Sequence, residues 1–102
     1  MKATLYLPRQ LPRTVSVEGL EMPDTSGYAK VPEQVPALLG CAPSLVDVLA
    51  SGTNYVAYSI FDLEEEVNHG AMKAVAEVSG AVFDAEDEDS VLCGPILLVV
   101  AD

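Results

Sequence analysis

The sequence has few of the residue types that usually carry chemistry. Its 102 residues include no tryptophan, only six aromatic residues, two cysteines, one histidine and five basic residues. Because half of the residues are apolar and few are aromatic, the expected core is mostly aliphatic. No apolar signal core follows Met1, and the longest apolar run, residues 95–101, is too short to span a bilayer. We therefore expect a cytoplasmic protein, in the host cell if it is encoded by a phage.

Cys41 and Cys93 lie far apart and have no CxxC or metal-ligand spacing. Both have apolar neighbours, so the favoured interpretation is two free, buried thiols in a reducing compartment. A disulfide and a catalytic thiol are the alternatives. A Cys–His dyad would need one of them beside His69. The single histidine excludes a two-histidine metal site, and the favoured interpretation is a polar residue at a helix start.

An acidic stretch that begins at Asp84 is similar to a calcium-binding loop, with acids at alternate positions 84, 86 and 88. An EF-hand needs glycine at its sixth position and glutamate at its twelfth, where this chain has Asp89 and Pro95. Weak, non-specific cation binding is the most that this pattern indicates. The glycines are isolated, so no phosphate-binding loop is predicted. We expect no catalytic residues, no metal site and no cofactor, and a binding role rather than an enzyme.

The formal net charge of −11 is unevenly distributed along the chain. Residues 1–43 hold four acidic and four basic residues, whereas residues 44–102 hold twelve acidic residues and one base, Lys73. Such a chain repels nucleic acid and anionic membranes, so neither is an expected partner. A basic protein surface or a cation is the natural partner, and the bland alternative is a solvated face that keeps the protein soluble. Two runs hold most of the acids: Asp62, Glu64, Glu65 and Glu66, then Asp84, Glu86, Asp87, Glu88 and Asp89.

The hydrophobic pattern predicts a single acidic α+β domain over residues 1–102. Its expected sheet is mixed or antiparallel, with about five strands and two helices in the order ββαββαβ. Strands are predicted at 2–8, 13–18, 44–50, 55–63 and 90–101, and helices at 32–40 and 64–79. The run Ile96–Val100 is continuously apolar, which predicts a central strand covered on both faces. Tyr55 and Tyr58 should lie on opposite faces of their strand, with one of them in the core.

The region from residue 32 to the C-terminus resembles a family of small domains of unknown function that is common in bacteriophage genomes. The resemblance is carried by Gly40, the strands around Val46 and Ile60, and two short motifs, Asn68-His-Gly-Ala71 and Cys93-Gly-Pro-Ile-Leu-Leu-Val99. The loop at residues 19–31 departs from the family's compact pattern. The resemblance implies a phage or phage-derived accessory protein, without an assigned activity.

Two functions follow from these observations. In the first, the acidic runs bind a basic surface on a nucleic-acid-binding or host-defence protein and inhibit it, as a DNA mimic does. In the second, the acids serve only solubility and the domain, as a monomer or a homodimer, binds or sequesters a small ligand. The pocket expected for that ligand lies at the helix start, at Asn68, His69 and Gly70, where free backbone N–H groups favour anions.

Overall fold

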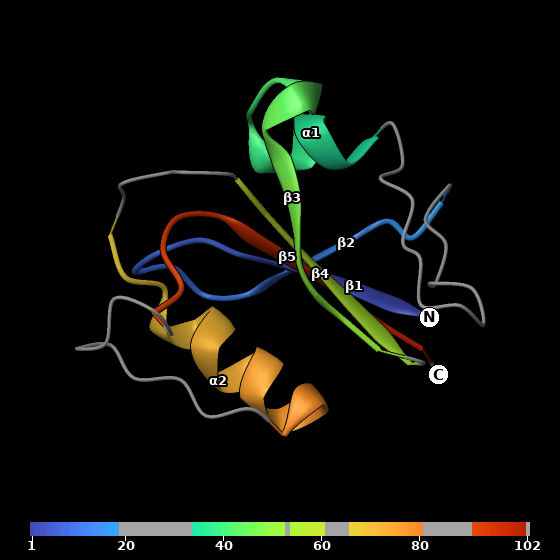
Figure 1. The fold of residues 1–102 in the computed structure, drawn as a ribbon, viewed down its shortest axis with the longest axis vertical. Coiled ribbons are helices and arrows are strands. Elements are labelled where there is room, and N and C mark those ends of the chain that lie inside the picture. The colour runs from blue at the N-terminus through green and yellow to red at the C-terminus, as the bar shows by residue number, and fades with distance from the viewer. Residues whose placement is uncertain (19–33, 53, 61–65, 81–90, 102) are drawn as a thin grey trace.

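The computed structural model describes residues 1–18, 34–52, 54–60, 66–80 and 91–101. These residues form a five-stranded sheet with one helix against each face (Figure 1). The strand order is β2-β1-β5-β4-β3, and every neighbouring pair is antiparallel. The predicted α+β class, the single domain and the element order are confirmed.

The strands are short and follow the predicted apolar segments. They are β1 (Lys2–Tyr6), β2 (Arg13–Val15), β3 (Val46–Ser51), β4 (Tyr55–Ile60) and β5 (Ile96–Val100). The prediction that Ile96–Val100 is central is confirmed, because β5 lies between β1 and β4 and its first four residues are buried. An irregularity between Val48 and Ala50 interrupts the pairing of β3, the strand at one edge of the sheet.

Side chains of β5 alternate between two hydrophobic clusters, one on each face. Leu97 and Val99 join the cluster under α1 (Gln34–Leu39), and Ile96 and Leu98 join the cluster under α2 (His69–Ser79). This alternation is the period of two that a strand imposes on its side chains. Because both faces of β5 are covered in this way, every residue of the strand is apolar.

The two tyrosines of β4 confirm the predicted arrangement. Tyr58 is fully buried in the α1-side cluster, whereas Tyr55 is partly buried and lies against the α2-side cluster. Burial raises the pKa of Tyr58 because the charged phenolate would lose its water.

Helix α1 has the predicted position and ends before Gly40, whose N–H donates to the carbonyl of Pro36 at 2.8 Å. Pro36 lies within the first turn, where its missing N–H costs little. A short 3-10 turn, η1 (Pro43–Leu45), then leads into β3. The sequence did not predict this turn.

The range 64–79 predicted for the long helix is wrong at its start, whereas the helix start expected at Asn68, His69 and Gly70 is confirmed. Helix α2 begins at His69 instead of Glu64, its N-cap is Asn68, and its first turn contains no acidic residue. The end is as predicted: Gly80 has φ 75° and closes the helix through an N–H donated to Ala76 at 2.9 Å. A positive φ of this kind is the usual reason for glycine after a helix. The acids at 64–66 therefore precede α2 in the sequence, and none of them lies in its first turn.

Candidate functional site at the start of α2

The buried side chain of Asn68 holds three parts of the chain together. Its Oδ1 accepts from the N–H of Ala71 at 3.1 Å, which caps α2. Its Nδ2 donates to the carbonyl of Tyr6 at 2.9 Å and to that of Gly94 at 2.7 Å. Only 1% of Asn68 is exposed, and these three bonds occupy the amide. The predicted ligand-pocket residue Asn68 is therefore a structural residue whose polar atoms are already satisfied.

The segment before α2 pairs with the segment before β5. Val67 and Cys93 form an antiparallel bridge, which we call the neck. Backbone bonds flank it on both sides: Gly94 N–H to Glu66 at 3.0 Å, and Asn68 N–H to Leu92 at 2.8 Å. The neck fixes the position of the helix start relative to the central strand β5.

The turn between β1 and β2 faces the same place. Gln10 N–H donates to the carbonyl of Leu7 at 3.2 Å, with Pro8 and Arg9 between them. Arg9 has φ 60°, the only positive φ at a non-glycine among the described residues. A type II turn needs positive φ at this position, which glycine or asparagine usually fills. Arg9 instead reaches back to the neck, where its Nε lies 3.1 Å from Oε2 of Glu66.

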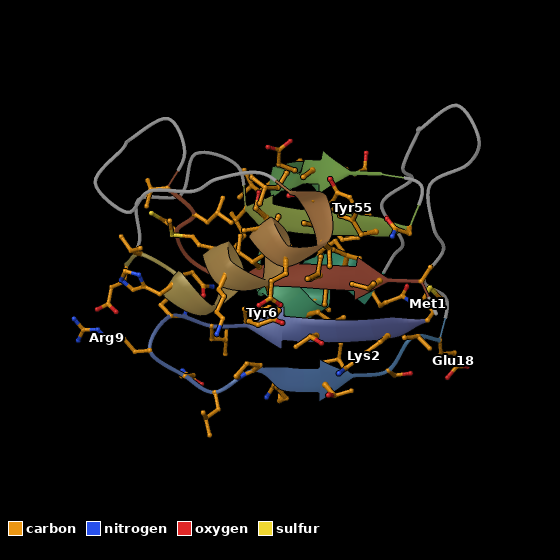
Figure 2. All side chains as sticks on the ribbon, turned by 90° about the horizontal axis from the view of Figure 1, so that it is seen from below. Met1, Lys2, Tyr6, Arg9, Glu18 and Tyr55 are labelled. Atoms are coloured by element: carbon orange, nitrogen blue, oxygen red, sulfur yellow. The ribbon has the colours of Figure 1, made fainter. Side chains whose placement is uncertain are left out.

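A hollow of about 550 Å³ lies between this turn and the start of α2. The Arg9–Glu66 ion pair stands at its rim, with both side chains mostly in solvent, so that the pair contributes little to stability. The labelled side chain of Arg9 projects outward from the end of β1 in Figure 2. The hollow is lined by Leu7, Arg9, Gln10, Leu11, Glu66, Val67, Asn68, His69 and Gly70.

The three predicted pocket residues all line this hollow, but in different ways. His69 and Gly70 are exposed at its surface, whereas Asn68 is buried beneath it. The sequence reasoning missed the residues from the β1–β2 turn. Two prolines, Pro8 and Pro12, were the available signal that this turn is constrained, but nothing local indicated that it faces the start of α2.

A second groove lies along α2, between the helix and β1. Two hollows of about 270 and 360 Å³ share Tyr6, Ala74 and Glu77, and Lys2 and Lys73 lie in their walls. The pKa of Tyr6 is raised, first by burial and then by the negative charge of Glu77, while a hydrogen bond with Thr4 acts in the opposite direction. Two bases and one acid line this groove, so its walls carry little net charge.

The acidic runs fall largely outside the described residues. Of the nine predicted interaction residues only Glu66 is described, and it is exposed beside the hollow. The described residues contain four acids (Glu18, Asp47, Glu66 and Glu77) and four bases (Lys2, Arg9, Arg13 and Lys73), so they are formally neutral. The remaining positions of the sequence hold twelve acids and one base, which accounts for the whole net charge of −11.

The described residues show where one end of each acidic run joins the fold. The first run ends at Glu66, on one side of the neck, and the second run leads through Val91 to Leu92, on the other. From strand geometry these attachment points, Glu66 and Leu92, are roughly 8 Å apart. One end of each run therefore joins the described part of the chain at the neck, whereas the other ends lead back to Ile60 of β4 and to Gly80 after α2.

Metal and membrane features are lacking in the described part of the chain. No three His, Cys, Asp or Glu side chains gather there as metal ligands. Both cysteines are free thiols of intermediate burial rather than fully buried as predicted. No helix in the described ranges is long and apolar enough to cross a membrane.

Comparisons with known proteins give no relative. No protein-family model matches the chain, no curated protein matches it, and no solved structure matches its fold. The site must therefore be interpreted from its own geometry and charge.

Proposed function

We propose that this chain is an acidic binding domain whose two acidic runs engage one basic surface on another protein. The observation that carries the proposal is that the described part of the chain is formally neutral, while the whole net charge lies in the remaining positions, mostly in two acidic runs that each have one end at the neck. If the acids served solubility alone, acids scattered over the whole chain would serve equally well. Acids that are concentrated in two runs add their fields at any partner surface that meets both runs.

The resemblance to phage-associated domains gives the proposal a biological form. A chain with this charge would occupy a nucleic-acid-binding site on a host protein, including a defence protein, by offering carboxylates in place of phosphates. Its place of action would then be the host cytoplasm. In this form the domain inhibits the host protein by occupying its nucleic-acid-binding site, and it carries out no reaction of its own.

The first test neutralises the runs and keeps the body intact. Changing Glu64, Glu65, Glu66, Asp87 and Asp89 to their amides should abolish capture of a basic partner from host extract at low salt. The matched control changes five acids elsewhere to amides and produces the same net charge: Glu18, Glu21, Asp24, Glu33 and Asp47. Equal capture by the two variants would contradict a role for the runs beyond total charge.

A second test addresses inhibition by mimicry. A captured nucleic-acid-binding protein should be released by added duplex DNA, and binding should weaken steeply as salt rises. Simultaneous binding of DNA and of this domain to the partner would contradict occupancy of the DNA site.

The hollow supports a second function, the binding of a small ligand. Its volume of about 550 Å³ lies in the range of small-molecule sites, about 300–1,000 Å³. The exposed start of α2 at His69 and Gly70 would favour an anion, but Glu66 stands at the same rim. A rise in melting temperature with nucleotides or cyclic nucleotides, absent in the buffer control, would favour this function over the first.

A further inference from the structure

The larger hollow of the groove between α2 and β1, which we call the α2–β1 pocket, has a lining that argues for one class of ligand. We propose that it binds a free α-amino acid with an aliphatic side chain, of about the size of leucine. The inference goes beyond both functions proposed above, because it uses neither the acidic runs nor the hollow at the start of α2. All residues that line the α2–β1 pocket belong to the described part of the chain.

The α2–β1 pocket exists because the side chains between the helix and the strand are small. At its start the helix lies close to β1: Asn68 donates to the carbonyl of Tyr6 at 2.9 Å, and a Cβ on Gly70 would lie 3.5 Å from the ring of Tyr6. One turn further along, α2 presents only the methyl group of Ala74, and β1 presents Thr4. The space left is about 360 Å³, within the range of small-molecule sites, about 300–1,000 Å³.

The inner lining of the α2–β1 pocket is largely apolar. Leu98 and Val100 line it from the central strand β5, and Val78 lines it from α2. Val78 and Val100 are only partly buried, so part of their apolar surface still meets water. An aliphatic group that covers them removes this surface and its own from water, which favours binding.

The mouth of the α2–β1 pocket carries one charge of each sign. Lys2 and Glu77 line it, and both are exposed. Neither has an ion-pair partner within the described ranges, where Arg9 pairs with Glu66. Burial first, and then the negative charge of Glu77, raise the pKa of Tyr6, so this carboxylate lies near the phenol that lines the same pocket. Figure 2 shows Lys2 and Tyr6 at the two ends of β1.

The two charges and the apolar lining together favour a zwitterion with an aliphatic body. A lone anion at this mouth would be attracted by Lys2 but repelled by Glu77, and a lone cation would meet the reverse. An α-amino acid carries a carboxylate and an ammonium on one carbon, so it satisfies both side chains at once. Its aliphatic side chain would then lie against Leu98 and Val78. Because Lys2 and Glu77 are exposed, each ion pair would contribute modestly to affinity.

The first test is a titration of the full chain with free leucine, followed through its amide resonances by NMR. Saturable shifts should gather at Thr4, Tyr6, Val78 and Val100, which line the α2–β1 pocket. The amide of His69, beside the other hollow, should not move. Absence of saturable shifts, or shifts gathered around His69, would overturn the site.

Three relatives of leucine test the parts of the ligand separately. Leucinamide lacks the carboxylate, N-acetyl-leucine lacks the ammonium, and alanine lacks the branched aliphatic group. Loss of either charge should weaken binding about three- to fivefold, as expected when one exposed ion pair is removed. Alanine should bind about tenfold or more below leucine, because most of the apolar group is missing. Any of the three that binds as tightly as leucine would overturn the assignment of an aliphatic amino acid.

Two single substitutions assign the charges to their residues. Glu77→Gln should weaken the binding of leucine about three- to fivefold without weakening that of N-acetyl-leucine, since the lost contact is with the ammonium. Lys2→Gln should weaken the binding of leucine by a similar factor without weakening that of leucinamide. Glu18→Gln and Lys73→Gln are the matched controls, because they remove the same charges from exposed positions outside the α2–β1 pocket. Controls that weaken leucine as much as the two test variants do would reduce the effect to overall charge and overturn the site.

A further variant fills the α2–β1 pocket. Ala74→Leu should abolish binding of leucine, whereas Ala76→Leu adds the same side chain at a half-buried position of α2 outside the pocket and should leave binding unchanged. Thermal unfolding checks that both variants fold. If Ala74→Leu does not fold, the substitutions of Lys2 and Glu77 provide the test, because both positions are exposed. Unchanged binding in a folded Ala74→Leu variant would place the ligand elsewhere and contradict the proposal.

Discussion

The side-chain amide of Asn68 donates to the carbonyl of Gly94 at 2.7 Å and so ties the start of α2 to the segment that enters the central strand. The same side chain caps the helix and bonds to the end of β1. One residue therefore positions the helix, the neck and one wall of the hollow.

Substitution of Asn68 should be among the most destabilising single changes in the protein. Asn68→Ala removes the cap and the hydrogen bonds to the carbonyls of Tyr6 and Gly94, which we expect to cost about 2–4 kcal/mol of unfolding free energy. Asn68→Ser keeps a capping oxygen and should recover about 1 kcal/mol of that loss. Urea unfolding followed by circular dichroism measures both values. Equal stability of the two variants would show that the cap contributes nothing.

Two glycines of α2 should respond to alanine with opposite signs. Gly80→Ala places a side chain at φ 75°, where space is free but the backbone conformation is unfavourable, and should cost about 1 kcal/mol. Gly70→Ala lies inside the first turn, and its Cβ would meet Tyr6 at 3.5 Å, an ordinary contact. It should stabilise by about 0.5–1 kcal/mol because alanine favours helix. Thermal unfolding of both variants gives the signs, and two shifts in the same direction would contradict this explanation.

Arg9→Gly should stabilise the protein, although it removes an ion pair. Glycine adopts the positive φ at this turn position without strain, a gain of about 1 kcal/mol over a non-glycine residue. The ion pair with Glu66 is exposed, so its loss offsets little of that gain. Glu66→Gln, which breaks the same pair without touching the turn, is the control and should leave the melting temperature nearly unchanged. A less stable Arg9→Gly would mean that the ion pair outweighs the strain.

Alkaline pH should weaken the fold through Tyr6. Its pKa is raised above the ordinary value of 10.0, so the folded state holds the phenolic proton more tightly than the unfolded chain does. The resulting contribution to stability is complete below about pH 10 and is lost as the pH rises through the folded-state pKa. Unfolding free energies measured across this range should fall less steeply for Tyr6→Phe than for the wild-type protein.

The negative charge of Glu77 causes part of the rise in the pKa of Tyr6. Glu77→Gln should lower the pKa of Tyr6 without returning it to 10.0, because burial is the larger cause. The difference between tyrosinate absorbance titrations with and without Tyr6 isolates this group. An unchanged titration in Glu77→Gln would exclude the charge of Glu77 as a cause.

Local sequence patterns predicted the strands well because their apolar residues repeat with the period of a sheet. Ile96–Val100 could be placed at the centre of the sheet since only a strand covered on both faces is apolar at every position. The start of α2 was misplaced because acids at 64–66 have the composition typical of a first helical turn. What sets the true start is Asn68, whose partners Tyr6 and Gly94 are distant in sequence.

The site was predicted only in part for the same reason. Asn68, His69 and Gly70 were identified from the expected helix start, but the opposite wall comes from the β1–β2 turn. The position of Leu11 in the same hollow as a segment more than fifty residues away depends on how β1 pairs with β5, which no local pattern encodes.

The neck has one further consequence, for how the sequence can change over time. Pairing of Val67 with Cys93 ties together the two ends of a chain excursion that leaves the sheet after β4 and returns to it in β5. The free energy needed to close such an excursion grows only with the logarithm of its length. Insertions, deletions and charge changes between Gly80 and Leu92 would therefore leave the sheet in place. Selection can alter that stretch while the rest of the molecule stays the same.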